Sequence, residues 1–313
     1  MLAERLDRLA AGHYTIPSVP EEVARHAQAL DTLPVGTSGK VGVLDLAFER
    51  RGGRTELTGH YQKTPLQIMR PLYYDPARPD LPYVFVMSAG AGVLQGDRYR
   101  IDVTCGAGAS VHVTTQTATK VYRMEQDYGT QLVRLTAGPG GYLEYLPDPV
   151  IPFAGSRFYQ RTHLTCDPGA SAIVAETMLA GRLARGERHA YTAYCSDLSV
   201  HRPGGALLFA DPLRLVPGRS PVAGPAMFGE HGVLATLYVI TQAVEAGALA
   251  DALHEAAAGS GTAGGASTLP NGAGAWVRLL GPESPPVLAT LDRLWDLARR
   301  LIVGHPAPDR RKP

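Results

Sequence analysis

The chain has 313 residues, enough to bury a substantial core in one large domain or two small ones. Its formal net charge is only +1, and 19% of its residues are charged. This balance argues against nucleic acid as the main partner, because phosphate binding usually demands a basic excess. No stretch approaches the roughly 18 apolar residues of a membrane helix, and the charged N-terminus is unlike a signal peptide. Three cysteines are too few for a disulfide framework. We therefore expect a cytoplasmic protein with no membrane partner.

The N-terminal part of the chain predicts little regular structure. Leu2, Leu6 and Leu9 could form one face of a short helix, and residues 21–30 another, before Pro34 breaks the pattern. We expect residues 1–38 to be a weakly structured extension. A single β-rich domain is then expected over residues 39–304, and a disordered tail over residues 305–313.

A period of two begins after Lys40 and is typical of strands. Leu44, Leu46 and Phe48 alternate with smaller or polar residues, and residues 51–54 read as a hairpin turn. The 35 glycines and 25 prolines favour many tight turns over long helices.

A loose internal repeat follows. Four turns align on Gly108, Gly140, Gly169 and Gly204, with intervals of 32, 29 and 35 residues, and each leads into a strand-like segment. Similar strand–turn–strand units at a nearly constant interval predict stacked layers of antiparallel strands. The fold class is therefore expected to be mainly β, a β-helix-like scaffold with a few helices.

The clearest helix is expected at the C-terminus. Residues 258–275 are mostly Gly, Ala, Ser and Thr and read as a flexible loop. Beyond them, Ser284 can cap a helix that Gly304 can end. Its apolar stripe comprises Val287, Leu288, Leu291, Leu294, Trp295, Ala298, Leu301 and Ile302.

The common catalytic motifs are absent from the sequence. Gly90, Gly92 and Gly96 follow a strand, but the third glycine comes one residue late for a dinucleotide fingerprint, and no helix pattern follows. No phosphate-binding loop of the Walker type, zinc-protease helix or serine-hydrolase elbow occurs. We therefore expect no enzymatic activity.

A polar, hydroxyl-rich segment at residues 114–120 is the first candidate site. Alternation places His112 and Thr114 on one face of a strand and Thr115 on the other. The alternative is a solvated edge strand whose hydroxyls satisfy backbone groups.

Three carboxylates interrupt otherwise apolar segments. Glu176 ends a buried run and must be paired or solvated, either in an ion pair with Arg182 or in a functional polar lining. Glu144 should point away from its neighbours Leu143 and Tyr145. Asp97 is expected to stabilise a turn through backbone amides.

Cysteines at matching turns offer a further possibility. Cys105 and Cys166 occupy equivalent positions in the repeat and could approach each other if the layers stack directly. Small buried cysteines are the commoner explanation, and we assign no metal site.

Taken in order, several segments resemble the urease accessory protein D (UreD, or UreH) family over roughly residues 40–304. The most specific is the threonine-rich segment ending Ala118-Thr119-Lys120-Val121-Tyr122-Arg123. The matching stretches are residues 67–71, 90–97, 114–123, 143–147, Glu176 with Gly181-Arg182 and Gly186-Glu187, and residues 277–281. The motif residues singled out as structural or functional are Gly96, Thr119, Lys120, Tyr122, Arg123, Arg182 and Glu187.

The resemblance implies a scaffold or chaperone required for urease maturation. Proteins of this kind bind the helical accessory protein F, which recruits the GTPase accessory protein G, and the complex docks on apo-urease. Nickel is expected to pass through the scaffold to the urease active site, so Ni²⁺ is handled transiently and no cofactor is bound tightly. The C-terminal helix with its neighbouring loops is the expected docking surface for the helical partner.

A passage for Ni²⁺ suits weak oxygen ligands, because tight thiolate or imidazole chelation would trap the ion. The lining residues we expect are Glu176, Thr115, Glu144 and Asp97, followed by His112. Two alternatives remain open: a β-helix hydrolase that uses Glu144 and Glu176 as acid and base, and an interaction scaffold unconnected to metals.

Overall fold

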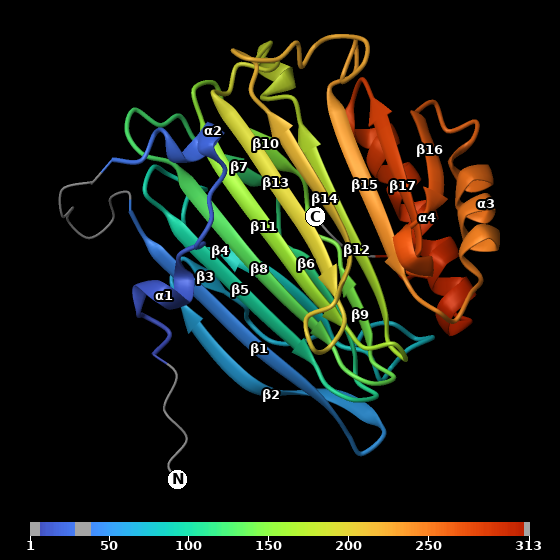
Figure 1. Ribbon diagram of the computed structural model, residues 1–313. Helices are drawn as coiled ribbons and strands as arrows, with labels where there is room; N and C mark the ends of the chain where they lie inside the picture. The colour runs from blue at the N-terminus through green and yellow to red at the C-terminus, as the bar shows by residue number, and fades with distance from the viewer. Residues whose placement is uncertain (1–6, 29–38, 310–313) are drawn as a thin grey trace.

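Two long β-sheets lie face to face and form the body of the molecule, as Figure 1 shows for a computed structural model that describes residues 7–28 and 39–309. Within the described residues the first sheet has seven strands, in the spatial order β14 (Leu207–Leu215), β13 (Ala193–His201), β11 (Arg157–Cys166), β8 (Gly129–Ala137), β5 (Arg98–Cys105), β1 (Val41–Arg51) and β2 (Arg54–Lys63).

The second sheet faces the first. Its main path runs β16 (Ala263–Thr268), β17 (Gly274–Gly281), β15 (Val233–Ile240), β12 (Ser171–Leu179), β9 (Tyr142–Tyr145), β6 (Ser110–Thr115), β4 (Tyr83–Ser88) and β3 (Leu66–Gln67). Two short strands, β7 (Thr119–Val121) and β10 (Val150–Pro152), pair with each other, and β10 also pairs with β12.

The predicted repeat is the structural unit, and the mainly β, stacked architecture is confirmed. The turns at Gly108, Gly140 and Gly169 carry the chain from the first sheet to the second, as β5 to β6, β8 to β9 and β11 to β12. The turn at Gly204 differs, because β13 and β14 form an antiparallel hairpin within the first sheet.

The predicted strand direction needs correction. Stacked neighbours β5, β8, β11 and β13 run parallel, as do β4, β6, β9 and β12. Each repeat is a coil that returns to the same sheet in the same direction, so only the two strands within one coil run oppositely. Antiparallel pairing occurs at both ends of the first sheet, and in the second sheet it runs from β12 through β15 and β17 to β16.

Strand alternation divides the buried side chains into two main clusters. Val111, Val113 and Val174 pack between the two sheets. Residues one step away, such as Ile173 and Ala175, belong to a cluster on the opposite face of the second sheet, beneath α3 (Ala246–Ala257) and α4 (Ser284–Val303). The second sheet is therefore buried on both faces, which explains its nearly continuous apolar strands.

The C-terminal helix occurs where the sequence predicts it, with two differences. Ser284 is its first helical residue and makes no cap, and Glu283 at the N-cap position accepts no side-chain cap hydrogen bond either. Gly304 ends the helix with φ of 73°, a conformation that favours glycine. Leu301 is 41% exposed and lies outside the buried stripe.

The flexible loop expected over residues 258–275 contains a strand. β16 pairs antiparallel with β17, from Ala263 opposite Leu280 to Thr268 opposite Ala275, and a short 3₁₀ turn (Pro270–Gly272) joins the two. The small residues that suggested flexibility permit close approach instead: a Cβ at Gly264 would lie 2.2 Å from the carbonyl oxygen of Arg278.

The described N-terminal residues pack against the outer face of the first sheet. Two single-turn helices, α1 (Ala11–Tyr14) and α2 (Glu21–Ala24), flank a cluster in which Ile16 and Val23 meet Tyr159 and Cys195. The helix predicted over residues 21–30 is therefore shorter, and residues 1–6 and 29–38 lie outside the described residues, as does the end of the tail, 310–313. No helix in the described ranges is long and apolar enough to cross a membrane.

Candidate functional site

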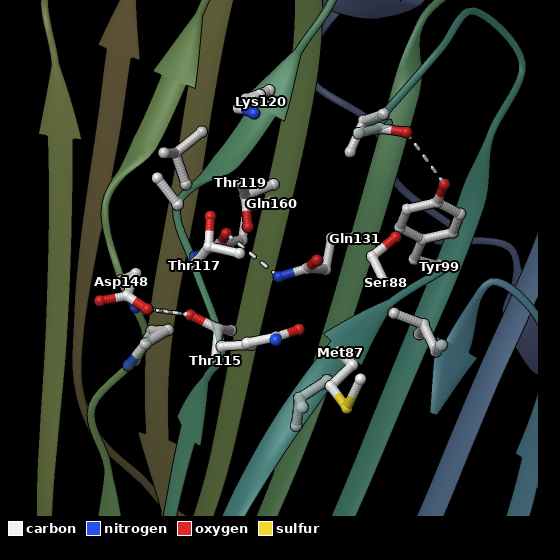
Figure 2. Close-up of a pocket in the computed structure, with 18 of the residues that line it drawn as sticks. Met87, Ser88, Tyr99, Thr115, Thr117, Thr119, Lys120, Gln131, Asp148 and Gln160 are labelled. Carbon is white, nitrogen blue, oxygen red and sulfur yellow. Dashed lines mark hydrogen bonds between the residues drawn. The ribbon is translucent and has the colours of Figure 1, made fainter. Parts of the chain in front are cut away.

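A polar cavity of about 140 Å³ lies between the two sheets. Figure 2 shows Thr115, Thr117, Gln131 and Gln160 around the same space, contributed by both sheets and by the segment that follows β6. The lining also includes Glu176 and Tyr194. The core between the sheets is thus interrupted by amides, hydroxyls and the carboxylates of Asp148 and Glu176.

The first sheet carries a row of polar residues, of which Tyr99, Gln131 and Gln160 line this cavity. Tyr99, Gln131, Gln160 and Ser196 occupy equivalent positions on β5, β8, β11 and β13. The Gln131 amide donates to the Gln160 side-chain oxygen at 3.4 Å. Sequence analysis missed these residues, yet they recur at nearly the same intervals as the four turns, so the repeat itself could have revealed them.

The exposed rim of the cavity is formed by the two motif segments. Val93, in the glycine-rich segment, donates its backbone N–H to the Lys120 carbonyl at 2.8 Å, and Tyr122 donates back to the Val93 carbonyl at 2.9 Å. Gly92 has φ of 146°, and a Cβ there would lie 2.3 Å from the Lys120 oxygen. Glycine is therefore required for the two segments to lie side by side.

Thr115 lines the cavity, on the strand face opposite His112. Its hydroxyl donates to the Asp148 carboxylate at 3.1 Å and accepts from the Asp148 backbone N–H at 2.8 Å. Thr119 and Lys120 also line the cavity, whereas Tyr122 packs on Phe153 beside it. The threonine-rich segment is therefore a cavity rim rather than a plain solvated edge.

Glu176 lines the cavity, is partly buried, and is held by neutral donors. Its carboxylate accepts hydrogen bonds from Gln160 at 3.1 Å, Thr162 at 3.3 Å and Ser196 at 3.2 Å. Burial raises the pKa of Glu176, although the bonds from Gln160 and Ser196 act in the opposite direction. The predicted ion pair with Arg182 is not formed, because Arg182 pairs with Glu187, with 2.8 Å between Arg182 Nε and the carboxylate.

A second, smaller cavity begins on the other side of Glu176. Its lining includes Asp211, Tyr238 and Arg278, and it shares Glu176, Thr177 and Tyr194 with the first cavity. The Asp211 side chain accepts from Tyr238 at 2.5 Å and pairs with Arg278, whose side chain is 36% exposed. Glu176 therefore lies at the junction of two polar spaces.

Glu144 and His112 lie on the opposite face of the second sheet, outside this cavity. The His112 ring is hydrogen bonded to Glu144 at 2.6 Å, and the Tyr142 hydroxyl donates to the same carboxylate at 2.5 Å. Arg299 of α4 lies 3.8 Å from Glu144, pairs with Asp75 and donates to Tyr83 at 2.5 Å. All these side chains are buried. Glu144 and His112 were expected to line a nickel passage. Neither lines this cavity, and both contact α4, which they join to the sheet.

The charges in this cluster control its protonation. Burial of Glu144 acts to raise its pKa, but the hydrogen bond and charge of His112, with the charge of Arg299, lower that pKa below its ordinary value. Because Glu144 and Glu176 occupy opposite faces of the sheet, they share no cleft. The hydrolase alternative that paired these two carboxylates is therefore not supported.

Asp97 has the turn-stabilising role predicted for it. Its carboxylate accepts from the backbone N–H of Lys40 at 2.8 Å and of Leu94 at 2.9 Å, and from the Tyr99 hydroxyl at 2.8 Å. Gly96, with φ of 74°, completes this turn. Asp97 is fully buried and is not among the residues that line the cavity, so its support of the rim is indirect.

The cysteines do not meet. Cys105 and Cys166 both align with Ala137 of the intervening strand β8, so one strand separates them. All three cysteines are buried and free, and burial raises the pKa of Cys166 to about 11. Within the described ranges, no three His, Cys, Asp or Glu side chains are grouped so that they could hold a metal ion.

The structure is a β-solenoid-like scaffold with a partly polar cavity between its sheets. Comparison with known proteins identifies its family. Residues 40–313 match the family model described as the UreD urease accessory protein. The chain is 56% identical over 293 residues to "Urease accessory protein UreD 2" of Streptomyces griseus, covering 93% of this chain and 100% of that one.

Two more distant relatives carry the same description. "Urease accessory protein UreD" of Haloarcula marismortui is 40% identical over 285 residues, covering 91% of this chain and 95% of that one. "Urease accessory protein UreD 2" of Brucella suis is 36% identical over 291 residues, covering 92% and 96%. This chain belongs to the UreD urease accessory protein family.

Proposed function

We propose that this protein acts in the maturation of urease, in the cytoplasm, as a scaffold through which Ni²⁺ reaches the active site of apo-urease. Family membership supports the maturation role. The sequence resemblance supports a division of labour in which the F and G accessory proteins bind this scaffold and the GTPase hydrolyses nucleotide. The protein itself then acts as a chaperone in complex assembly and not as a catalyst.

The observation that carries the proposal is the position of Glu176. This carboxylate lies where two polar cavities meet between the sheets. Around it are amide and hydroxyl oxygens, which bind a divalent cation weakly and allow it to leave. Among the described residues that line the first cavity there is no histidine or cysteine.

A moving cation needs a site that attracts it without holding it. An ionised Glu176 supplies one negative charge inside the protein, away from bulk water, where attraction is stronger than in water. Because its pKa is raised, protons compete with Ni²⁺ for this carboxylate at a higher pH than at an ordinary glutamate. Transfer should therefore weaken progressively as the pH falls through that raised value.

The test is urease activation in cells that carry a urease gene cluster with this gene replaced by Glu176→Gln. We expect roughly tenfold or greater loss of urease activity and of nickel per purified urease, as for the loss of a metal-contacting residue. Glu49→Gln, which changes an exposed carboxylate on β1, is the matched control and should activate urease normally.

Co-purification with the F and G proteins separates transfer from assembly. The proposal requires Glu176→Gln to retain both partners. Full urease activation by Glu176→Gln would overturn the proposal that Ni²⁺ passes this carboxylate. Full activation in cells lacking the gene would overturn the maturation role itself.

A further inference from the structure

An open groove of about 680 Å³ lies beside the cavity rim, at the N-terminal end of α4. Its sides come from β7, β10, the end of β12 and the 3₁₀ turn η1 (Leu183–Arg185). Pro282, Glu283, Ser284 and Pro285 close it from the helix side. The groove thus joins segments that lie far apart in the sequence.

The groove is apolar at its base. Ile151, Phe153, Leu179 and Leu183 line it and are only partly buried. Phe153 is fixed by Tyr122, with ring centroids 4.8 Å apart, and by the Arg182 guanidinium, 4.3 Å above its ring. A fixed aromatic surface with accessible aliphatic neighbours is a typical anchor point for an apolar side chain of a partner.

The rim is strongly basic, although the whole chain has a net charge of only +1. Lys120, Arg182, Arg185 and Arg188 line the groove, against the single carboxylate of Glu283. Arg182 is neutralised by Glu187.

The other three cations are less closely balanced, although Arg185 interacts electrostatically with Glu187. Lys120, Arg185 and Arg188 are exposed, and no carboxylate of the described residues forms a salt bridge with them. Arg188 donates to the backbone carbonyl of Glu230 at 2.9 Å, and this acceptor carries no formal charge. Three such cations around an apolar base select an acidic segment that also carries apolar side chains.

We propose that this groove, defined by Lys120, Phe153, Leu183, Arg185 and Arg188, docks an acidic peptide segment of a protein partner in urease maturation. This inference rests on the proposed function for one point: that the docked partner takes part in urease maturation. The apolar stripe of α4 is buried against the sheet, so the loops at its N-terminal end, rather than the helix face, provide the contact surface.

Lys120 gives the docking site a further role, because it lines both the groove and the cavity. Its ammonium group and the neighbouring arginines repel a divalent cation that approaches the cavity from solvent. Carboxylates of a docked acidic segment would neutralise these charges and present oxygen ligands at the rim. Docking of the partner therefore makes this entrance permissive for Ni²⁺.

The experiment begins with a photo-crosslinking amino acid at Ala184, an exposed residue in the groove, in the full-length protein expressed with the urease gene cluster. Mass spectrometry of the crosslinked peptide identifies the occupant. We expect a segment with net negative charge and at least one large apolar residue. A neutral or basic segment, a nucleic acid or a lipid at this position overturns the proposal.

Charge reversal then tests the mechanism of binding. The double variant R185E/R188E should bind the purified partner roughly tenfold or more weakly, and raising the salt concentration should weaken the wild-type complex. The double variant R134E/R219E makes the same change in net charge at exposed arginines outside the groove and should bind normally. Lysine substitutions at the acidic residues of the crosslinked segment should restore binding of R185E/R188E.

Equal binding by the two double variants would overturn the docking site. That result would leave the proposed function intact, because Glu176→Gln reports on metal transfer independently of this groove. Loss of partner binding by R185E/R188E with normal activation of urease would instead retain the docking site and remove its role in maturation.

Discussion

Glu144 and Glu176 lie on neighbouring strands of the same sheet, both inside the protein, and their surroundings differ in almost every respect. Glu144 faces α4 and contacts His112 and Arg299 in a closely packed cluster. Glu176 faces the space between the sheets, where only neutral groups donate to it. The charged form of Glu144 is stabilised, whereas burial disfavours the charged form of Glu176, so location inside the protein alone does not indicate function.

The largest expected effect is on the charged cluster. Arg299→Met keeps a side chain of similar length but leaves Asp75 and Glu144 without their cation, and removing one partner of a buried ion pair costs about 3–5 kcal/mol. Urea denaturation measures the free energy of unfolding. Arg300→Met is the control. It changes the next residue in the helix and removes the ion pair of Arg300 with Asp296, so it should cost less than about 1 kcal/mol. Equal losses of unfolding free energy in the two variants would show that the buried ion pairs of Arg299 do not stabilise the protein more than the surface pair of Arg300.

A smaller effect is expected when Glu144 is neutralised. Because its folded-state pKa is lowered, its ionised form stabilises the protein above the ordinary glutamate pKa of about 4.3, and that contribution is lost as the pH falls through the folded value. Glu144→Gln should therefore reduce the free energy of unfolding by about 2 kcal/mol at pH 7. The difference from wild type, measured by urea denaturation, should shrink below about pH 4.3. A difference that is constant with pH would contradict this account.

The smallest effect, and one of opposite sign, is expected at the cavity. The folded-state pKa of Glu176 is raised, so any stability linked to its protonation is present below the ordinary glutamate pKa and lost as the pH rises through the raised value. At neutral pH, Glu176→Gln removes a charge that burial disfavours. The melting temperature should stay the same or rise by up to about 3 °C. A fall in melting temperature as large as that caused by Glu144→Gln would show that the two carboxylates do not differ in their effect on stability.

The sequence pattern predicted the fold better than it predicted the site. The glycine turns and the alternation around His112, Thr115 and Glu144 placed each side chain on the correct face of its strand. Alternation does not say which face meets a helix and which meets another sheet. Glu144 and Glu176 were therefore grouped together, although the structure separates them.

Other features depend on contacts between distant segments. Composition alone suggested a flexible loop where β16 pairs with β17, because small residues serve both mobility and close packing. The groove at the end of α4 could not be predicted from the sequence either, since Lys120, Phe153 and Arg185 come together only when the coils stack. Residues that recur with the repeat, such as Gln131 and Gln160, were the part of the site open to prediction.

The partnership of Arg299 with Asp75 spans 224 residues of sequence and has a consequence for biosynthesis. On the ribosome, Asp75 and Glu144 emerge well before Arg299, so the outer face of the second sheet must wait for α4 with its carboxylates unneutralised. Until α4 packs on it, that face exposes to water the apolar and charged side chains that are buried in the folded protein. Newly made chains are therefore exposed to aggregation and proteolysis until synthesis has passed α4.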